Sequence, residues 1–332
     1  MANMGAGKEY WNQRRVFVTG ATGMIGSWLV KELIGLGAYV VALVLDAEPQ
    51  SELYRSGDIN KISVANGRLE DFATLTRAIN VHEVDTVFHL GAQTIVGAAQ
   101  RFPWPTFEAN IRGTYNLLEA CRLHKDLVRC VVVASSDKAY GEQAQLPYTE
   151  DMPLLGRYPY EASKSCGDLL AQSYHIAYGL PLAILRCGNV YGGGDLNWSR
   201  IVPGTIRSFL WGEPPVIRSD GTYIRDYIYV RDVVQGYIRL AEYLGDGKVL
   251  GEAFNLSPES KVTVLEIVRE IQQVMHCQHI EPRICSTAKG EIRSQYLSSA
   301  KAKRFLGWSA QYSLAEGLKE TVAWYRQYLG AK

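Results

Sequence analysis

The feature that most constrains the fold is a glycine-rich stretch near the N-terminus, residues 16–26 (VFVTGATGMIG). An apolar, β-branched run stops at Gly20, and Gly23 and Gly26 follow at equal spacing. From Met24 onward the apolar residues recur at helical spacing, so the stretch predicts a strand, a tight turn and a helix. Backbone amides at the start of such a helix, together with its dipole, form a site that favours a pyrophosphate.

Each glycine has its own expected role. Gly20 permits the turn, Gly23 lets the backbone approach a phosphate, and Gly26 allows the helix to pack closely on the strand. Glycine turns of this kind are common, so the triplet alone is equally consistent with a purely structural turn. A second apolar run ends at Asp46, 20 residues beyond Gly26. A carboxylate at that strand tip would bind a ribose 2′-hydroxyl and repel a 2′-phosphate, which favours NAD over NADP.

Composition excludes several classes of protein. The 332 residues are 47% apolar, which suits two modest domains or one extended α/β unit. The formal net charge of +1 argues against a nucleic-acid or membrane-surface partner, and no run of 18 apolar residues predicts a membrane span. Residues 1–15 lack a signal-peptide core. The six cysteines lack CxxC spacing, so we expect no metal site, buried thiols at Cys130 and Cys187, and a cytoplasmic location.

Strands and helices alternate along the first half of the chain. Apolar runs predict strands near residues 62–64 and over 84–90, 128–134 and 180–187, with a helix capped by Asp71 and a long helix over about 107–124. This alternation predicts an α/β fold with a doubly wound parallel sheet, whose ligands bind beyond the carboxyl ends of the strands.

The chain is expected to form two interleaved lobes without a distinct linker. A Rossmann domain for NAD would comprise residues 1–188, with about 224–256 returning to it. Residues 189–223 and 257–332 would form a smaller, mixed α/β substrate-binding lobe.

Residues at the predicted strand tips extend the cofactor site. Leu69 is placed to cover an adenine ring, although a leucine there is usually part of the core. We interpret His89 as a core histidine, and we expect Asn110 either to hold the next strand tip in place or to face solvent. The candidate cofactor-binding residues are Gly20, Thr22, Gly23, Met24, Ile25, Gly26, Asp46, Leu69, Leu90, Ala92, Tyr160 and Lys164.

Tyr160 and Lys164 start another predicted helix and, four residues apart, share one face of it. An ammonium group there would lower the pKa of the tyrosine from about 10 towards neutrality. Such a tyrosine can take a proton from a sugar or alcohol hydroxyl while hydride leaves the carbon. The YxxxK pattern is short enough to arise by chance. The glycine turn, Asp46 and the upstream Ser136 together favour a catalytic pair.

The order of TGATGMIG (residues 19–26), Ser136 and YEASK (residues 160–164) resembles the extended short-chain dehydrogenase/reductase superfamily, in its nucleotide-sugar epimerase/dehydratase branch. The resemblance covers essentially the whole chain. The triplet Ser136-Asp137-Lys138 and the segment 188–195 (GNVYGGGD) are most similar to CDP-glucose 4,6-dehydratases, since epimerases usually carry small or apolar residues after the serine. Residues 224–230 (IRDYIYV) resemble the epimerases instead, so the nucleotide base stays open.

The resemblance implies a 4,6-dehydratase that uses NAD and converts a nucleoside-diphosphate hexose into a 4-keto-6-deoxy sugar. The steps would be oxidation at C4, loss of water across C5 and C6, and hydride return to C6. Tyr160 would deprotonate the 4-hydroxyl, and Ser136 would hydrogen-bond it. Asp137 would protonate the departing C6 hydroxyl, and Lys138 would take the C5 proton. The alternative for Asp137 and Lys138 is a surface ion pair.

The second half of the chain is expected to bind the substrate. A diphosphate needs cationic donors, for which Arg225 and Arg293 are the best candidates, although either could form a surface ion pair. The glycine-rich residues 192–198 predict a flexible loop that moves over a nucleotide sugar. The resemblance also implies a homodimer through helices at about 107–124 and 160–177. The candidate substrate-binding residues are Gln93, Asn189, Arg200, Arg225 and Arg293.

Two other functions stay open. An NAD-dependent nucleotide-sugar 4-epimerase shares every candidate residue except a need for Asp137 and Lys138. A non-catalytic NAD-binding sensor or scaffold belongs to another class, and the intact Ser136, Tyr160 and Lys164 argue against it.

Overall fold

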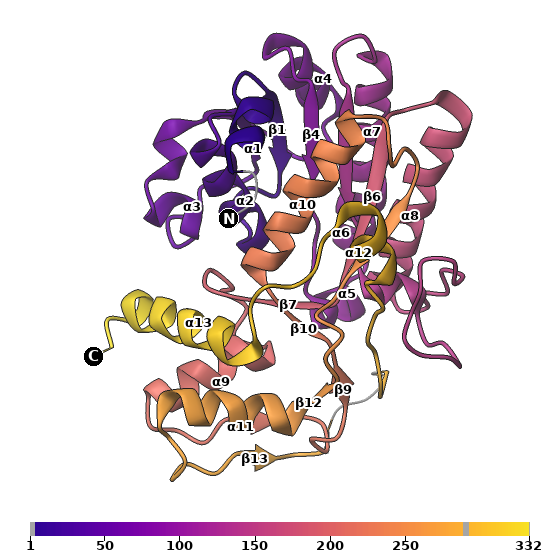
Figure 1. The fold of residues 1–332 in the computed structure, drawn as a ribbon. Coiled ribbons are helices and arrows are strands. Elements are labelled where there is room, and N and C mark those ends of the chain that lie inside the picture. Colours follow the sequence, from indigo (N-terminus) through magenta and orange to yellow (C-terminus); the bar gives the residue numbers. More distant parts are fainter. Residues whose placement is uncertain (1–3, 288–291, 332) are drawn as a thin grey trace.

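The computed structural model describes residues 4–287 and 292–331 (Figure 1). Its centre is a seven-stranded sheet in the order β11-β6-β5-β4-β1-β2-β3, in which every neighbouring pair is parallel. The predicted parallel α/β sheet is therefore confirmed. The strands are β1 (Arg15–Thr19), β2 (Tyr39–Val44), β3 (Ser63–Asn66), β4 (Thr86–His89), β5 (Cys130–Ala134), β6 (Leu182–Cys187) and β11 (Ala253–Leu256).

Helices cover both faces of the sheet, because alternate side chains of each buried strand point to opposite sides. In β1, Val16 and Val18 pack with α2, whereas Phe17 packs with α4 on the other face. One face carries α2 (Met24–Gly35), α10 (Val230–Gly245) and α12 (Ala300–Leu306), with Trp11 of α1 (Met4–Trp11). The other carries α4 (Phe72–Val81), α7 (Gly113–Leu123) and α8 (Pro159–Tyr178). Asp71 caps α4 as predicted, accepting a hydrogen bond from the Thr74 amide at 3.2 Å.

The long helix predicted over residues 107–124 is broken into three parts. These are α6 (Trp104–Phe107), the π-helical turn η2 (Glu108–Arg112) and α7. Asn110 lies in the wide turn and is buried, so the solvent-facing alternative is wrong. Its amide hydrogen-bonds the backbone of Gln93 in both directions, at 2.7 and 3.0 Å. Gln93 follows β4, so Asn110 holds the end of the preceding strand and not the next one.

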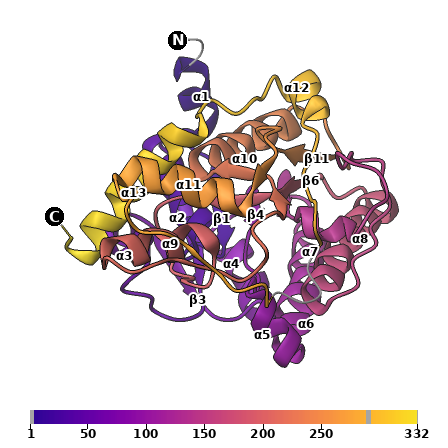
Figure 2. The ribbon, with the colours of Figure 1, turned by 90° about the horizontal axis from the view of Figure 1, so that it is seen from below.

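A smaller lobe lies beyond one end of the sheet, at the bottom of Figure 1. Three of its helices share one apolar core, namely α9 (Ile201–Leu210), α11 (Val264–Met275) and α13 (Leu314–Leu329). They lie in front of the sheet in Figure 2. Two-stranded pairs complete it: β10 (Tyr227–Tyr229) with β7 (Asn189–Tyr191), β12 (Val262–Thr263) with β9 (Ile224–Arg225), and β13 (Arg283–Ile284) with β8 (Val216–Ile217).

The chain crosses between the lobes several times. Within the predicted return at about 224–256, α10 and β11 join the sheet region, whereas β9 and β10 pair in the smaller lobe. Within the predicted second lobe, α12 and Trp308 pack against the core beside α10. The exact lobe boundaries stay a prediction. The remaining short elements are α3 (Glu52–Arg55), η1 (Asp58–Lys61), α5 (Val96–Arg101) and η3 (Asp137–Tyr140).

The thiols and the helices agree with two expectations from composition. All six cysteines are free, and Cys130 and Cys187 are buried as predicted. In residues 4–287 and 292–331, no helix combines the length and apolar character needed to cross a membrane.

Candidate active site

The glycine turn lies where the order of the sheet reverses, between β1 and β4. Gly20 follows β1 with a φ of +72°, and a Cβ there would lie 2.7 Å from the amide nitrogen of Gly91. Thr19 Oγ1 accepts a hydrogen bond from that amide at 3.0 Å. A Cβ on Gly26 would lie only 2.1 Å from the Gly20 carbonyl oxygen, so helix and strand pack as closely as predicted. The turn and the end of β4 therefore meet at the position where α/β sheets bind their ligands.

The start of α2 fits a dinucleotide. Gly23 is its N-cap in an extended conformation, and no side chain in the described part of the chain caps it. Gly23 is exposed, and Thr22, Met24 and Ile25 are partly exposed around it. The first amides of the helix are thus available to an anion. Asp46 lies exposed just after β2, on the side of the turn away from β4.

Leu69 lies between the cofactor edge and the core. It is 9% exposed, and its side chain packs against the backbone of Gly91 and Gly113 so closely that a Cβ on either glycine would come within 3.0 Å of it. Leu90 and Ala92 flank Gly91 and are partly exposed. These three side chains lie at the predicted edge, and their contact with a cofactor stays a prediction.

The triplet Ser136-Asp137-Lys138 forms the turn that follows β5. Ser136 Oγ caps the short helix η3 by accepting from the Lys138 amide at 3.2 Å, and it donates to Asp137 Oδ1 at 3.0 Å. Asp137 is 3% exposed, so the surface ion pair considered as its alternative is wrong. Burial raises the pKa of Asp137, and the neighbouring Lys138 opposes that shift. A carboxyl whose pKa is raised gains in suitability as a proton donor.

Tyr160 and Lys164 lie on the first turns of α8, whose start is fixed by Pro159 and by the Glu161 carboxylate, which accepts from the Tyr158 amide at 3.3 Å. Burial raises the pKa of Tyr160 to about 12, while the charge of Arg200 and a hydrogen bond with Ser136 lower it. The expectation that the protein's own lysine brings Tyr160 towards neutrality is therefore wrong. Burial outweighs the local charges, and the cation that acts most strongly on Tyr160 is Arg200.

Lys164 is directed at the sheet. Its Nζ donates to the Ala134 carbonyl oxygen at the end of β5, at 3.0 Å. Burial lowers the pKa of Lys164 to about 8, and Asp168 opposes the shift. Lys164 thus keeps most of its charge at neutral pH beside the strand that carries the Ser136 turn.

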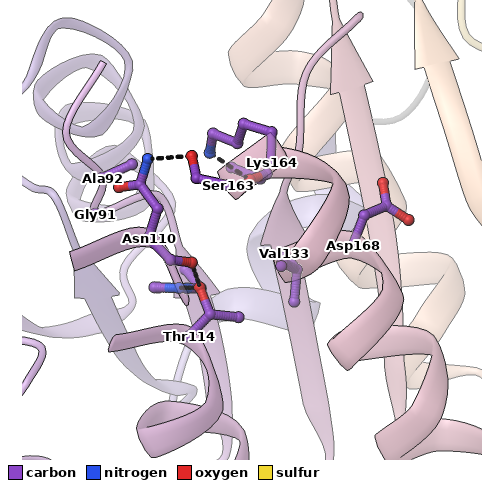
Figure 3. Close-up of a pocket in the computed structure, with 11 residues that line it drawn as sticks. Gly91, Ala92, Asn110, Thr114, Val133, Ser163, Lys164 and Asp168 are labelled. Atoms are coloured by element: carbon purple, nitrogen blue, oxygen red, sulfur yellow. Dashed lines mark hydrogen bonds between the residues drawn. The ribbon is translucent and has the colours of Figure 1, made fainter. Parts of the chain in front are cut away.

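A small buried cavity beside Lys164 is lined by a polar network (Figure 3). Asn110 Nδ2 donates to Ser163 Oγ at 2.9 Å, and Ser163 donates to the Tyr160 carbonyl at 2.7 Å. Thr114 Oγ1 donates to the Asn110 carbonyl and lies 2.9 Å from His89 Nε2. His89 is buried with both ring nitrogens bonded, and burial lowers its pKa to about 3, so its interpretation as a core histidine is confirmed. The network joins the loop after β4 to the helix that carries Tyr160.

Residues 16–257 match the NAD dependent epimerase/dehydratase family. The chain belongs to this family. It is 32% identical to the CDP-glucose 4,6-dehydratase of Salmonella typhimurium, over 97% of this chain and 93% of that protein. The solved structure of the UDP-glucose 4-epimerase of Thermotoga maritima with UDP-glucose is similar with a TM-score of 0.87 and 31% identity, covering 95% of this chain and 99% of that one. The solved structure of the dTDP-glucose 4,6-dehydratase of Streptomyces venezuelae with NAD is similar with a TM-score of 0.86 and 28% identity. The match covers 95% of this chain and 98% of that one.

The chain is therefore an NAD-dependent enzyme of nucleotide-sugar chemistry, as its glycine turn and tyrosine–lysine pair indicated. Its relatives include both dehydratases and epimerases, so membership of the family leaves the reaction open.

Arg200 of this epimerase/dehydratase-family enzyme bridges two loops at the site. Its guanidinium donates to Asp195 Oδ2 at 3.1 Å and to Thr94 Oγ1 at 3.3 Å. Its charge also acts on Tyr160, which places it beside the catalytic candidates.

Arg225 and Arg293 lie on adjacent backbone segments with different exposure. Arg225 is 7% exposed, and its Nη1 donates to the Ile224 and Arg293 carbonyls at 2.9 and 3.2 Å. Its charge acts on Asp137. Arg293 is exposed and lies near Asp220. Asn189 is partly exposed on β7, with its amide bonded to the Asp226 carbonyl at 2.8 Å.

The glycine-rich residues 192–198 are held at several points. Trp28 Nε1 donates to the Gly193 carbonyl at 2.8 Å, and Tyr325 donates to the Asp195 carbonyl at 2.6 Å. A Cβ on Gly193 would lie 2.3 Å from the Trp324 ring. This differs from the flexible loop that the glycines predict, because Gly193 makes room for an indole of α13.

Sequence reasoning missed Gln295, which is fully buried and hydrogen-bonded to both Asp137 and Lys138. No sequence motif identifies Gln295 as a site residue. Arg293, two residues earlier, is the residue of this segment that was predicted from the sequence.

Proposed function

We propose that this enzyme is a nucleoside-diphosphate-hexose 4,6-dehydratase. The observation that carries the proposal is the buried Asp137, whose pKa is raised by burial, adjacent to Lys138 on the turn that faces Tyr160. Hydride transfer alone needs one proton-transfer group at O4, whereas removal of water needs two more. The similarity to a CDP-glucose 4,6-dehydratase along nearly the whole chain supports the same reaction.

The first stage is oxidation at C4. When bound, NAD supplies the hydride acceptor for C4, the hydride donor for C6 and a positive charge beside the phenol. Gly20, Gly23, Gly26 and Asp46 would hold it. Tyr160 takes the proton of the 4-hydroxyl, and Ser136, which lowers the pKa of Tyr160, orients that hydroxyl. The Arg200 charge favours the phenolate, and Lys164 is fixed on the Ala134 carbonyl at the end of β5.

The second stage is loss of water. A ketone at C4 acidifies the C5 hydrogen, so Lys138 in its neutral form removes that proton. Asp137 in its protonated form gives its proton to the departing C6 hydroxyl, which leaves as water. Lys138 then returns its proton to C5. The proton that Tyr160 gains from O4 balances the one that Asp137 gives up, so one water is the only net loss.

We expect the diphosphate of the substrate to be bound by arginines of the smaller lobe. Arg200 acts on Tyr160 and Arg225 lies beside the backbone of Arg293, and guanidinium groups bind phosphate oxygens in pairs. Gln93 and Asn189 present amide groups from the ends of β4 and β7. We propose these five as the substrate-binding residues.

A 4-epimerase is the second candidate. The solved UDP-glucose 4-epimerase is as similar in fold as the dehydratases are, and residues 224–230 resemble that group. An epimerase would use Ser136, Tyr160 and Lys164 in the same way and would leave Asp137 and Lys138 without a chemical role.

The test is a panel of CDP-, GDP-, UDP- and dTDP-glucose, read for the alkaline absorbance of a 4-keto-6-deoxy product. We expect ketone from at least one donor without added cofactor, because NAD should copurify. An epimer without ketone would establish the second candidate. No turnover of any donor would overturn both and favour a non-catalytic NAD-binding protein.

We further propose that the enzyme is a cytoplasmic homodimer that pairs through α7 and α8. Large apolar side chains on these helices are exposed, including Leu123, Leu169, Tyr178 and Ile176, the last of them 81% exposed. Large exposed apolar side chains are often found where a protein contacts a partner. Sedimentation of Ile176→Asp against the wild type tests it. A wild type that sediments as a monomer contradicts the proposal.

A further inference from the structure

Asp137 and Lys138 are held by a side chain from the far end of the sequence. Gln295 Nε2 donates to the Asp137 carbonyl oxygen at 3.1 Å, and Lys138 Nζ donates to Gln295 Oε1. Both ends of one amide are thus used by the two residues proposed to remove water. Gln295 is 0% exposed, so bulk water cannot replace these hydrogen bonds if they are broken.

The backbone of Gln295 belongs to the substrate side of the site. Its amide donates to the Ile224 carbonyl at 3.1 Å, and the Ile224 amide donates to the Arg293 carbonyl at 2.9 Å. Ile224 and Arg225 form β9, so Gln295 lies on the same small ladder as both candidate diphosphate arginines. This ladder lies below the carboxyl ends of the central strands in Figure 1.

We propose that Gln295 is a positioning residue that fixes the Lys138 amine and the Asp137 backbone relative to C5 and C6 of the sugar, and that connects them to the diphosphate end of the site. The proposal rests on the dehydratase function proposed above.

The amide is chemically suited to this task. A base for the C5 proton must be neutral when it acts, and a neutral oxygen acceptor orients an amine without the strong stabilisation of its ammonium form that a carboxylate would give. Glutamine at this position therefore directs Lys138 while leaving it free to lose its proton. Among the described residues, the charged or titratable groups that act on Asp137 include Arg225 and Asp226 from the β9–β10 corner, Tyr148 from the loop after η3, Tyr160 of α8 and Cys187 at the end of β6.

Two substitutions separate orientation from charge. Gln295→Met keeps the volume and removes both hydrogen bonds. Gln295→Glu keeps an acceptor for Lys138 and adds a negative charge. The matched control is Gln272→Met in α11, because Gln272 is also buried and also bonded at both ends of its amide, to Arg269 and to the Ile280 carbonyl.

The experiment uses the enzyme with NAD and CDP-glucose or whichever donor of the panel reacts, in D₂O, and follows deuterium at C5 and ketone over a range of pH. We expect Gln295→Met to slow both by about 10- to 100-fold, since misplacement of a reacting group by about 1 Å has effects of this size. For Gln295→Glu we expect the acid limb of the rate profile to move up by about one pH unit. Gln272→Met should retain the wild-type profile. Wild-type rates and profile in both Gln295 variants would overturn the proposal.

A second readout does not depend on turnover. Acetylation of Lys138 by acetic anhydride, measured by peptide mass spectrometry across pH, reports how readily the amine loses its proton. We expect its midpoint to move to higher pH in Gln295→Glu. An unchanged midpoint would overturn the proposal. If the wild type forms no ketone from any donor, the dehydratase function fails while this measurement still decides the role of Gln295.

Discussion

Two aspartates with the same burial are held in opposite ways. Asp168 on α8 is 1% exposed and receives both arms of the Arg186 guanidinium, at 2.8 and 2.9 Å. Asp137 is 3% exposed and receives the Ser136 hydroxyl, while the charges of Lys138 and Arg225 oppose the effect of burial on its pKa. Close to it lies Asp226, also buried, with one carboxylate oxygen that has no hydrogen-bond partner among the described residues.

The difference shows how one residue type serves structure and chemistry in one enzyme. A carboxylate that receives both arms of a guanidinium forms a strong, oriented ion pair, which suits a structural role. Arg186 extends this matched region to the Tyr140 hydroxyl at 2.8 Å, and Tyr140 donates to Asn255 at 2.8 Å. A buried carboxyl without such a match can hold a proton and give it up. The proposed chemistry uses Asp137 and not the Asp168–Arg186 pair.

The largest effect should come from removing the proton of Asp137. Asp137→Asn keeps the acceptor for Ser136 and cannot protonate the C6 hydroxyl, so we expect ketone formation to fall by about 10²- to 10⁴-fold. Deuterium exchange at C5, which depends on Lys138, should persist. The thermal midpoint should not fall, because the variant no longer buries a carboxylate. Ketone formation near the wild-type rate would place the acid elsewhere.

Breaking the matched pair should instead affect stability. Arg186→Met leaves the Asp168 carboxylate buried without its guanidinium, which should lower the free energy of unfolding by about 3–5 kcal/mol. Chemical denaturation measures this. The double variant Asp168→Leu/Arg186→Met should regain much of the loss, since it removes both charges. If Arg186→Met is as stable as the wild type, the Asp168–Arg186 pair does not have the structural role assigned to it.

The pH dependence of stability should come from Asp226, the buried carboxyl close to Asp137. Burial raises the pKa of Asp226 to about 7, so between pH 3.8 and 7 the folded state binds more protons than the unfolded state. Its contribution to stability is therefore full below pH 3.8 and is lost as pH rises through 7. We expect Asp226→Asn to exceed the wild type by about 1 kcal/mol above pH 7 and to lose that advantage in acid. A constant difference between the thermal midpoints of Asp226→Asn and the wild type across this pH range would contradict this.

The smallest effect concerns Lys164, which lies between the two regions. Burial lowers its pKa from 10.5 to about 8, so between these values the unfolded chain binds more protons and stability rises with pH. Lys164→Met should be more stable than the wild type below pH 8, by on the order of 1 kcal/mol. The advantage should shrink as pH approaches 10.5. A variant that loses stability at neutral pH would show that the bond to Ala134 outweighs desolvation.

Features that depend on neighbouring residues could be predicted well. The strand–turn–helix at Gly20 to Gly26, the Asp71 cap and the parallel sheet follow from backbone rules and the pattern of apolar residues. The positions of Ser136, Tyr160 and Lys164 at one end of the sheet follow from its parallel topology. The π-helical turn around Asn110 was missed because no residue pattern distinguishes it from an ordinary α-helical turn.

The sequence by itself determined the NAD-binding turn, the fold class and the family, because each rests on local spacings and on the order of segments along the chain. Only the tertiary structure decided how the site is held together. Gln295 meets Asp137 across 158 positions, Arg200 and not Lys164 is the cation that acts most on Tyr160, and Trp324 occupies the space that Gly193 leaves. These contacts depend on how separate elements pack and on the burial that results. The same packing gives Asp168 the Arg186 guanidinium as its partner and gives Asp137 the Ser136 hydroxyl, although both carboxyls are buried.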